Sequence, residues 1–410
     1  MSGHAAPLRW EMALPDGRRA NLLVRPGAVN LLLDGEQPSF TFDPLGRLHG
    51  AFYEGRNYRR SLDNRMLAKW TERAGGRTQR QRRWLASTEA QALVQVAYGL
   101  ARQVAATAQH APPAIQGVVR ALAGWDWAAL EADRIRFQQI YTPVGILPPD
   151  QYLALVLQAT HGCSHNACTF CTFYQDIPFR IKTPEQFRQH VAAVLDFFGP
   201  ALAMRKSVFL ADANALVAPM PRLLALLQVA GGMLQAASGG WQVTGDGYQP
   251  VAARNQSGDA SADLSMTVLS DLQPATSDLP LFAFIDAFHV ERKRVADWQE
   301  LRAHGLARVY IGMESGHDPL LRWLNKPGDA ADVLDAVTTL KAAGLQASVI
   351  ILLGAGGQPY ADGHVHDTTA LLNAMPLGKG DLVYFSDFVV HADAPYAALA
   401  AAGGIEPLPY

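Results

Sequence analysis

All three cysteines of the chain lie in one short segment, QATHGCSHNACTFCTFYQDIPFRIK, where Cys163, Cys168 and Cys171 have the spacing C-x4-C-x2-C. Three thiolates on one loop can bind three corners of an iron–sulfur cubane, which leaves the fourth iron open to a small molecule. Since the chain has only 3 cysteines, it cannot supply four thiolates to an electron-transfer cluster. The alternative is a structural zinc site with His161 or His165 as the fourth ligand.

The elements that must position this loop can be predicted from the residues that surround it. An apolar run at 152–159 ends just before the cysteines and is typical of a buried strand. Further apolar runs alternate with amphipathic helical segments. The runs lie at 207–211, 281–287, 307–313, 347–354 and 382–390, and the helical segments at 183–199, 220–234, 292–305, 329–344 and 360–375.

Such alternation indicates parallel strands joined by right-handed crossovers. Six repeats are compatible with a doubly wound sheet or with a partial (β/α)6 barrel. In both folds ligands bind at the carboxyl ends of the strands. The cysteine loop follows the first of these strands, so it is expected at the ligand-binding edge.

Residues 1–145 show a different pattern, in which strand-like runs come first and a helical segment follows. We expect a small α+β accessory domain there, followed by the core at 146–410. Strand-like runs at 21–27, 29–36 and 39–56 are broken by turns at Asp43 to Gly46 and at Glu54-Gly55. A helix is predicted over 89–106. Within the core, residues 236–279 are rich in Ser, Ala, Gly and Asp, and they are interpreted as a flexible surface insertion.

The net charge of −2 argues against a dedicated nucleic-acid or membrane-surface protein. The charge is unevenly distributed, because residues 1–150 carry 19 Lys and Arg against 13 Asp and Glu, whereas 151–410 carry 16 against 24. Ten basic residues lie between Arg56 and Arg83, with only Asp63 and Glu72 among them. We interpret this stretch as a solvated basic face on a helix-and-loop segment, with a patch for an anionic partner as the alternative.

The N-terminal residues lack the pattern of a secretory signal, and no run approaches ~18 uninterrupted apolar residues. An odd, clustered set of cysteines fits a metal site in a reducing compartment better than a disulfide framework. We therefore expect a cytoplasmic protein with no membrane partner, and the net charge of −2 disfavours a nucleic-acid partner.

The cysteine loop resembles the cluster loop of the radical S-adenosylmethionine superfamily, in the subgroup whose motif reads GCSxNxCTFCxFY. This chain has one residue more in the first gap than the usual C-x3-C-x2-C spacing, and the resemblance covers about 150–395. It implies a partial (β/α)6 TIM-like barrel in which Cys163, Cys168 and Cys171 hold a [4Fe–4S] cluster. It also implies that the reduced cluster cleaves S-adenosylmethionine to a 5′-deoxyadenosyl radical, which abstracts hydrogen from an organic substrate that the motif does not identify. A low-potential donor such as flavodoxin or ferredoxin would supply the electron.

The same resemblance implies which residues contact S-adenosylmethionine. These are Phe170, Asp212, Glu314, Ile351, Leu353 and Gly354. Phe170 is expected near the adenine, Asp212 at the amino group of the methionine moiety and Glu314 at the ribose hydroxyls. Ile351 and Leu353 would present apolar surface to the adenine, and Gly354 would let the backbone approach closely.

The substrate-side candidates are His391 and Asp393, which follow the sixth predicted strand, and Arg180, which follows the cysteine loop. Because no further cysteine exists, auxiliary clusters are not expected. The alternative function is a metal-stabilised protein that binds nucleic acid or another polyanion through its basic N-terminal face, without radical chemistry. A third hypothesis is a catalytically idle relative that keeps the cluster.

Overall fold

The computed structural model describes residues 7–34, 38–74, 76–237, 241–244, 247–250 and 279–408. The chain forms two compact units. The N-terminal unit contains Met1–Thr142, Ala193–Arg205 and Leu234–Asp278, and the C-terminal unit contains Pro143–Ala192, Lys206–Met233 and Leu279–Tyr410. The domain division at 1–145 and 146–410 stays a prediction.

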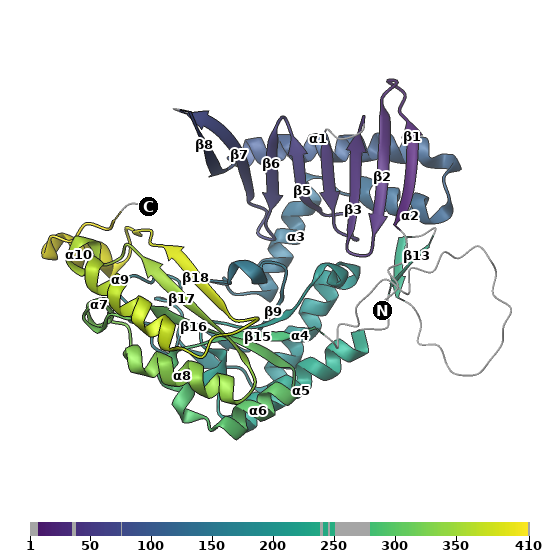
Figure 1. The fold of residues 1–410 in the computed structure, drawn as a ribbon. Coiled ribbons are helices and arrows are strands. Elements are labelled where there is room, and N and C mark those ends of the chain that lie inside the picture. The colour runs from purple at the N-terminus through teal and green to yellow at the C-terminus, as the bar shows by residue number, and fades with distance from the viewer. Residues whose placement is uncertain are drawn as a thin grey trace, which may run out of the picture. The chain divides into compact units, whose positions relative to one another are not determined.

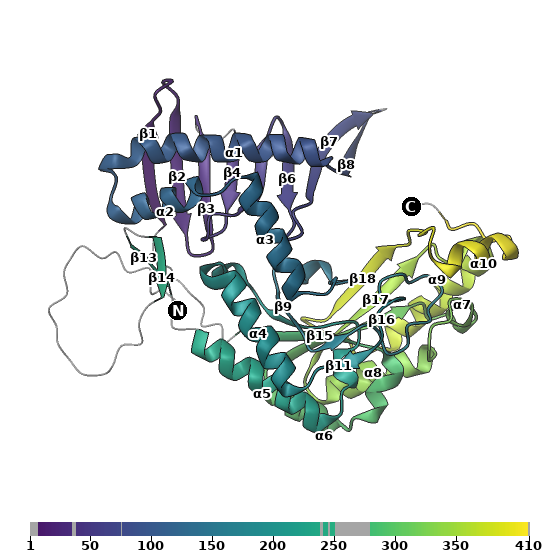
Figure 2. The same ribbon diagram turned by 180° about the vertical axis from the view of Figure 1, so that it is seen from behind.

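The N-terminal unit is an eight-stranded antiparallel sheet whose strands follow one another in chain order (Figure 1). The strands are β1 (Leu8–Ala13), β2 (Arg19–Arg25), β3 (Ala28–Leu33), β4 (Ser39–Phe42), β5 (Leu48–Tyr53), β6 (Arg56–Arg60), β7 (Met66–Ala74) and β8 (Arg77–Trp84). Buried residues alternate along β2 and β3, so one face is apolar. The helices α1 (Ser87–Thr107), α2 (Pro113–Ala123) and α3 (Trp127–Ile140) lie on that side of the sheet (Figure 2).

Both predicted hairpin turns are confirmed, because they join β4 to β5 and β5 to β6. Glu54 and Gly55 have φ of 48° and 72°, as a two-residue hairpin turn requires. The predicted helix at 89–106 lies within α1. The interpretation of 56–83 as helix and loop was wrong, because this stretch forms β6, β7 and β8. Most side chains at the far end of the β7–β8 hairpin are exposed, so they show no apolar alternation to indicate a strand.

The C-terminal unit contains a six-stranded parallel sheet, and the six predicted strands are confirmed. They are β9 (Leu155–Gln158), β12 (Val208–Ala211), β15 (Leu281–Ile285), β16 (Leu306–Glu314), β17 (Gln346–Leu353) and β18 (Leu382–Asp387). Their order in the sheet is β18-β17-β16-β15-β12-β9, which follows the chain without a reversal. A doubly wound sheet reverses its strand order, so that alternative is excluded.

The predicted helices of this unit are also confirmed. They are α4 (Pro184–Phe198), α5 (Met220–Ala237), α6 (Val295–Ala303), α8 (Ala330–Ala342) and α9 (Gly357–Ala374), to which the structure adds α7 (Asp318–Trp323) and α10 (Pro395–Gly403). Right-handed crossovers that always advance in one direction place the connecting helices on one face of the sheet, as Figure 1 shows. Thr183 caps α4, because its Oγ1 accepts from Gln186 N (3.1 Å) while its own N donates to Gln186 Oε1 (3.0 Å).

Most of the predicted insertion at 236–279 lies outside the described residues. In the described part, β13 (Trp241–Thr244) and β14 (Gly247–Pro250) pair as an antiparallel hairpin that lies beside α2 in the N-terminal unit. Among the described helices, none combines the length and the apolar character that crossing a membrane requires.

Candidate functional site

The cysteine loop begins directly after β9, and two residues with left-handed backbone shape it. Gly162 has a φ of 73°, and a Cβ at this position would lie 2.5 Å from the Ile177 carbonyl oxygen, so only glycine fits. Asn166 has a φ of 50° and donates from Nδ2 to Tyr174 O (2.7 Å). Its backbone N also lies 3.5 Å from Cys163 Sγ. These two residues fold the segment back on itself and so hold the cysteines on a short loop.

The three cysteines line one cavity of about 310 Å³ in the C-terminal unit. Six of the site residues predicted from the sequence line this cavity: Cys163, Cys168, Phe170, Cys171, Glu314 and His391. Phe284, Ile350 and Leu352 line its apolar side from β15 and β17. Within the described ranges, no His, Cys, Asp or Glu side chains form a group of three or more that could hold a metal ion as they stand. All three cysteines nevertheless line the same cavity.

Burial raises the pKa of all three thiols, and it raises that of Cys168 to about 12. The nearby ammonium group of Lys326 opposes this rise for each thiol. Thiolates are the form that binds metal, so metal binding at this loop would release protons.

A chain of polar contacts crosses the carboxyl ends of the strands next to the cysteines. Lys326 Nζ lies 3.4 Å from Glu314 Oε1 and 3.5 Å from Asp286 Oδ1. Asn214 Nδ2 lies 2.6 Å from Asp286 Oδ2 and 2.6 Å from Ser164 Oγ, within the cysteine loop. Glu314, Asp286 and Lys326 all line the cavity. Residues at or just after the carboxyl ends of β12, β15 and β16 are therefore joined to the loop by a chain of contacts through Asn214, Asp286 and Lys326.

Two features of Glu314 are energetically unfavourable. Its carboxyl group is buried, and its backbone is left-handed with a φ of 59°. Burial raises the pKa of its carboxyl group, and Lys326 opposes that rise. Burial by itself would lower the pKa of Lys326, but the nearby Asp286, Glu314, Cys168 and Cys163 together outweigh burial and raise it. A strained, buried carboxyl group that is paired with a cation on a cavity wall is typical of a functional site.

Lys326 and Asp286 were not predicted as site residues. Lys326 comes just after α7, a helix that was not predicted, so no strand end marked its position. Asp286 directly follows β15, and its place after a parallel strand was the available signal. A further tie holds Lys326 near the loop, because Asn325 Nδ2 donates to Ala167 O (2.7 Å).

Asp212 is buried beneath the cysteine loop, and its neighbour Ala213 lines the cavity instead. Its carboxylate accepts from Gln158 Nε2 (3.1 Å) and from the backbone of Gly162. Its own N donates to Thr160 Oγ1 (2.9 Å). Burial raises the pKa of Asp212 to about 6. In this position the side chain braces the base of the loop that carries the cysteines.

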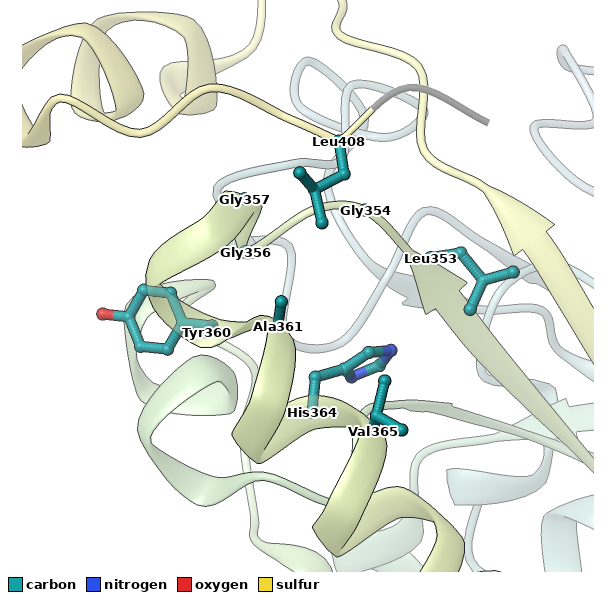
Figure 3. A pocket seen from close by; sticks show the side chains of 9 residues that line it. All are labelled: Leu353, Gly354, Gly356, Gly357, Tyr360, Ala361, His364, Val365 and Leu408. Atoms are coloured by element: carbon teal, nitrogen blue, oxygen red, sulfur yellow. The ribbon is translucent and has the colours of Figure 1, made fainter.

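The prediction for β17 was offset by one residue from the face that lines the cavity. Side chains alternate between the two faces of a strand. Ile350 and Leu352 line the cavity, whereas Ile351 lies on the opposite face of β17 and is fully buried there. Leu353 and Gly354 line a separate, mostly apolar cavity of about 200 Å³ that also includes His364 (Figure 3). The structure therefore does not bring these three predicted residues to the cysteine cavity.

Of the three substrate-side candidates, one lines the cysteine cavity and two do not. His391 lines the cysteine cavity with its ring centroid 6.5 Å from that of Phe173. Arg180 lies in β11 (Arg180–Ile181), a short strand that pairs with β10 (Thr160–His161), and its side chain is exposed. Asp393 is exposed and does not line this cavity.

Of the two histidines considered as zinc ligands, only His165 lines the cavity. Its Nε2 lies 2.9 Å from the Asn325 carbonyl oxygen. His161 belongs to β10, and burial lowers its pKa.

Comparison with models of protein families gives no match, and comparison with curated proteins gives none either. Solved structures similar to part of the chain include the cobalamin-dependent S-adenosylmethionine radical enzyme OxsB, at 14% identity over 61% of this chain and 36% of that one, with a TM-score of 0.41. Coproporphyrinogen III oxidase (HemN) from Escherichia coli, described as a radical SAM enzyme, matches at 14% identity over 67% and 51%, with a TM-score of 0.38. Methylornithine synthase (PylB) matches at 14% identity over 76% and 63%, with a TM-score of 0.35.

The chain thus spans less than two thirds of the length of each of these proteins. Likenesses at this level are too distant to carry an argument about the fold or the activity of the chain.

Proposed function

We propose that the protein is a radical S-adenosylmethionine enzyme whose Cys163, Cys168 and Cys171 hold a [4Fe–4S] cluster. One observation carries the proposal: three thiols from a single loop line one cavity at the carboxyl ends of a parallel sheet, next to Phe170 and Glu314. A cubane takes its three cysteine ligands at separate corners, so it needs thiols arranged around a space. The open sheet would be the partial (β/α)6 barrel of such enzymes.

When bound, the cluster and S-adenosylmethionine would supply a 5′-deoxyadenosyl radical for hydrogen abstraction from an organic substrate, with the electron coming from flavodoxin or ferredoxin. The residues of this chain would position the cofactor and keep water away. Glu314 would accept from the ribose hydroxyls, and Lys326 would face the carboxylate of the methionine moiety. Ile350 and Leu352 would pack on the adenine with Phe170. His391 would lie on the substrate side, and a cytoplasmic location would keep the thiols reduced.

The decisive experiment is anaerobic reconstitution of the full chain with iron and sulfide, followed by reduction and addition of S-adenosylmethionine. We expect a brown protein that holds about four irons per chain and releases 5′-deoxyadenosine. Methionine should appear in equal amount if the carbon–sulfur bond is cleaved reductively. A protein that takes up zinc alone and stays colourless would contradict the proposal.

Single variants test the ligand assignment. Cys163→Ala, Cys168→Ala and Cys171→Ala should each lose the four-iron absorption and all 5′-deoxyadenosine. Thr172→Ala is a matched control, since Thr172 lines the same cavity without a thiol. A full cluster in any one of the cysteine variants would show that this cysteine is not a ligand. His165→Ala separates the zinc alternative, because it should leave the iron content unchanged.

A further inference from the structure

Among the described residues, α1, α2 and α3 lie on one face of the N-terminal sheet (Figure 2), and the β5–β8 half of the other face is strongly basic. In an antiparallel ladder, residues directly opposite one another share a face, and successive residues alternate between faces. Met66 and Ala68 of β7 are buried on the helix side. Leu67, Lys69 and Thr71 therefore belong to the other face, which is turned toward the viewer in Figure 1.

The strand register assigns further cations to this face. Lys69 lies opposite Arg82, Leu67 lies opposite both Arg59 and Trp84, and Thr71 lies opposite Arg80. The exposed cations of the face are Arg59, Lys69, Arg73, Arg80 and Arg82. Within β5 to β8 the only acidic residue is Glu72, and it belongs to the helix side, opposite Gln79. We refer to these five cations together with Trp84 as the basic face.

The charges of the basic face are not compensated within the part of the chain that the structure describes. None of Lys69, Arg73, Arg80 and Arg82 takes part in an ion pair there. Lys69 and Arg82 lie directly across from one another, and like charges in that arrangement destabilise a sheet. Arg59 is 2.5 Å from His49 Nε2, but burial and the neighbouring arginine lower the pKa of His49 to about 4, so this partner is neutral. An anion bound here would relieve the repulsion.

An aromatic side chain accompanies the cations. Trp84 is 49% exposed, lies in the same cross-strand row as Arg59, and has the Arg65 guanidinium 4.7 Å from its ring centroid. The positions between the cations hold Asn57, Thr71 and Thr78, which can exchange hydrogen bonds with phosphate oxygens or base edges. Cations about 5 Å apart across strands and about 7 Å apart along one strand can follow a phosphate backbone.

We propose that the basic face binds a single strand of nucleic acid, with its arginines and Lys69 on the phosphates and Trp84 stacked on a base. Single strands are bound by positively charged surfaces that carry aromatic side chains, because an unpaired base offers a face for stacking. An acidic peptide has no such base. An anionic membrane would favour a larger apolar surface than Leu67 and Trp84 provide. This inference does not depend on the cluster.

The test uses the full chain and fluorescence anisotropy with labelled U20 and dT20, which distinguish RNA from DNA. The double variant Lys69→Gln/Arg82→Gln should bind at least tenfold more weakly. It should also reduce the slope of log affinity against log salt by about 1.4, since each phosphate contact on a single strand contributes about 0.7. Trp84→Leu should weaken binding about tenfold while leaving the salt slope unchanged.

The matched control is Arg188→Gln/Arg294→Gln, which removes the same charge from exposed, ion-paired arginines of the C-terminal unit. It should bind like the wild-type chain. Equal weakening by the two double variants would overturn the proposal, because the effect would then follow net charge alone. Absence of binding to both oligonucleotides would overturn it too. Phosphatidylserine vesicles or polyglutamate that compete as well as unlabelled U20 would assign the face to another class of partner and contradict this one.

Discussion

Glu314 and Lys326 are the residues where the electrostatics of the cysteine cavity are concentrated. Because Glu314 is buried, strained and paired with Lys326 at 3.4 Å, its carboxylate is held in a fixed position. We expect Glu314→Gln to weaken S-adenosylmethionine binding by about 10- to 100-fold, the usual loss for one hydrogen bond to a charged group. Isothermal titration of the reconstituted protein measures this affinity.

The iron content of Glu314→Gln should equal that of the wild-type chain, because the residue is not a ligand. Glu291→Gln is the control, since Glu291 is exposed and does not line the cavity. Unchanged affinity in Glu314→Gln would remove the ribose contact from the proposal without affecting the ligand assignment of the cysteines.

The raised pKa of Asp212 should make the stability of the protein depend on pH. Burial raises its pKa from 3.8 to about 6 in the folded chain, so the folded state binds this proton more tightly than the unfolded state does. Its favourable contribution is complete below about pH 4 and is lost as the pH rises through 6, a change on the order of 2–3 kcal/mol. Asp212→Asn cannot ionise, so its free energy of unfolding relative to the wild-type chain should rise by that amount between pH 4 and 7.

Urea denaturation at several pH values gives this difference directly. The sign is informative, because a surface carboxylate paired with a cation would produce the opposite slope. A flat difference would mean that Asp212 is better hydrated than its burial indicates.

At this scale, the residues that could be predicted are those fixed by the motif and by strand ends. The three cysteines, Phe170 and Glu314 line one cavity. The cysteines were expected there because their loop follows β9, whereas Phe170 and Glu314 were expected from the family resemblance. Ile351 could not be separated from Ile350, because β17 is apolar on both faces and gives no alternation to mark the cavity side. The role of Asp212 as a brace depends on a tertiary contact with Gly162 that no local pattern specifies.

At the scale of elements, the turn after β16 is fixed by its close approach to α9. A Cβ on Gly316 would lie 2.7 Å from both the Asp367 carbonyl oxygen and Thr368 Cα, which are backbone atoms of that helix. Gly316→Ala therefore forces the helix to move and should lower the free energy of unfolding by about 1–3 kcal/mol. Chemical denaturation followed by circular dichroism measures the change.

Gly231 in α5 offers a matched control, because a Cβ there meets nothing within 4 Å. Gly231→Ala should raise the free energy of unfolding by about 0.5–1 kcal/mol, since alanine stabilises a helix interior relative to glycine. If both variants were equally stable, the contact between Gly316 and α9 would not constrain the fold.

The predicted elements share a clear hydrophobic period, but such a period did not always lead to a prediction. Helix α2 was not predicted, although its buried Ile115, Val118, Val119 and Leu122 have helical spacing. The six parallel strands and the long helices between them bury apolar side chains, and this burial appears in their sequences as apolar runs and helical periods. Strands β6 to β8 were missed because charged residues occupy both faces, and α7 because it has only 6 residues. The alternation of strands and helices could not decide between a doubly wound sheet and a partial barrel, because strand order depends on contacts between elements far apart in the chain.

At the scale of the whole molecule, the chain combines two units that each have a hydrophobic core of their own. The charge asymmetry seen in the sequence follows this division in part, with the exposed cations of β6 to β8 in the N-terminal unit. According to the two proposals, the N-terminal unit would bind a single strand of nucleic acid and the C-terminal unit would carry out the radical reaction. Units with separate cores are expected to unfold separately unless a large apolar interface joins them.

Arg47 provides a test of that independence. Its guanidinium is buried in the N-terminal unit, where Nε lies 2.6 Å from Asp43 Oδ2 and Nη1 lies 3.4 Å from Asp133 Oδ1 of α3. Arg47→Ala leaves two buried carboxylates without their main partner, and such losses cost about 3–5 kcal/mol. The exposed pair Arg83–Glu89 gives the control, because solvent screens that pair and Arg83→Ala should change the free energy of unfolding little.

Hydrogen exchange read by mass spectrometry reports the two units of the full chain at once. In Arg47→Ala, peptides from β2 to β5 should exchange faster, since opening of the N-terminal unit becomes less costly. Peptides from β15 to β17 should keep their protection, because the hydrogen bonds of the Arg47 side chain go to Asp43, Asp133 and Phe197 of the N-terminal unit. Equal loss of protection in both sets would mean that the units unfold together. In that case, a destabilised N-terminal sheet would also release the cysteine loop.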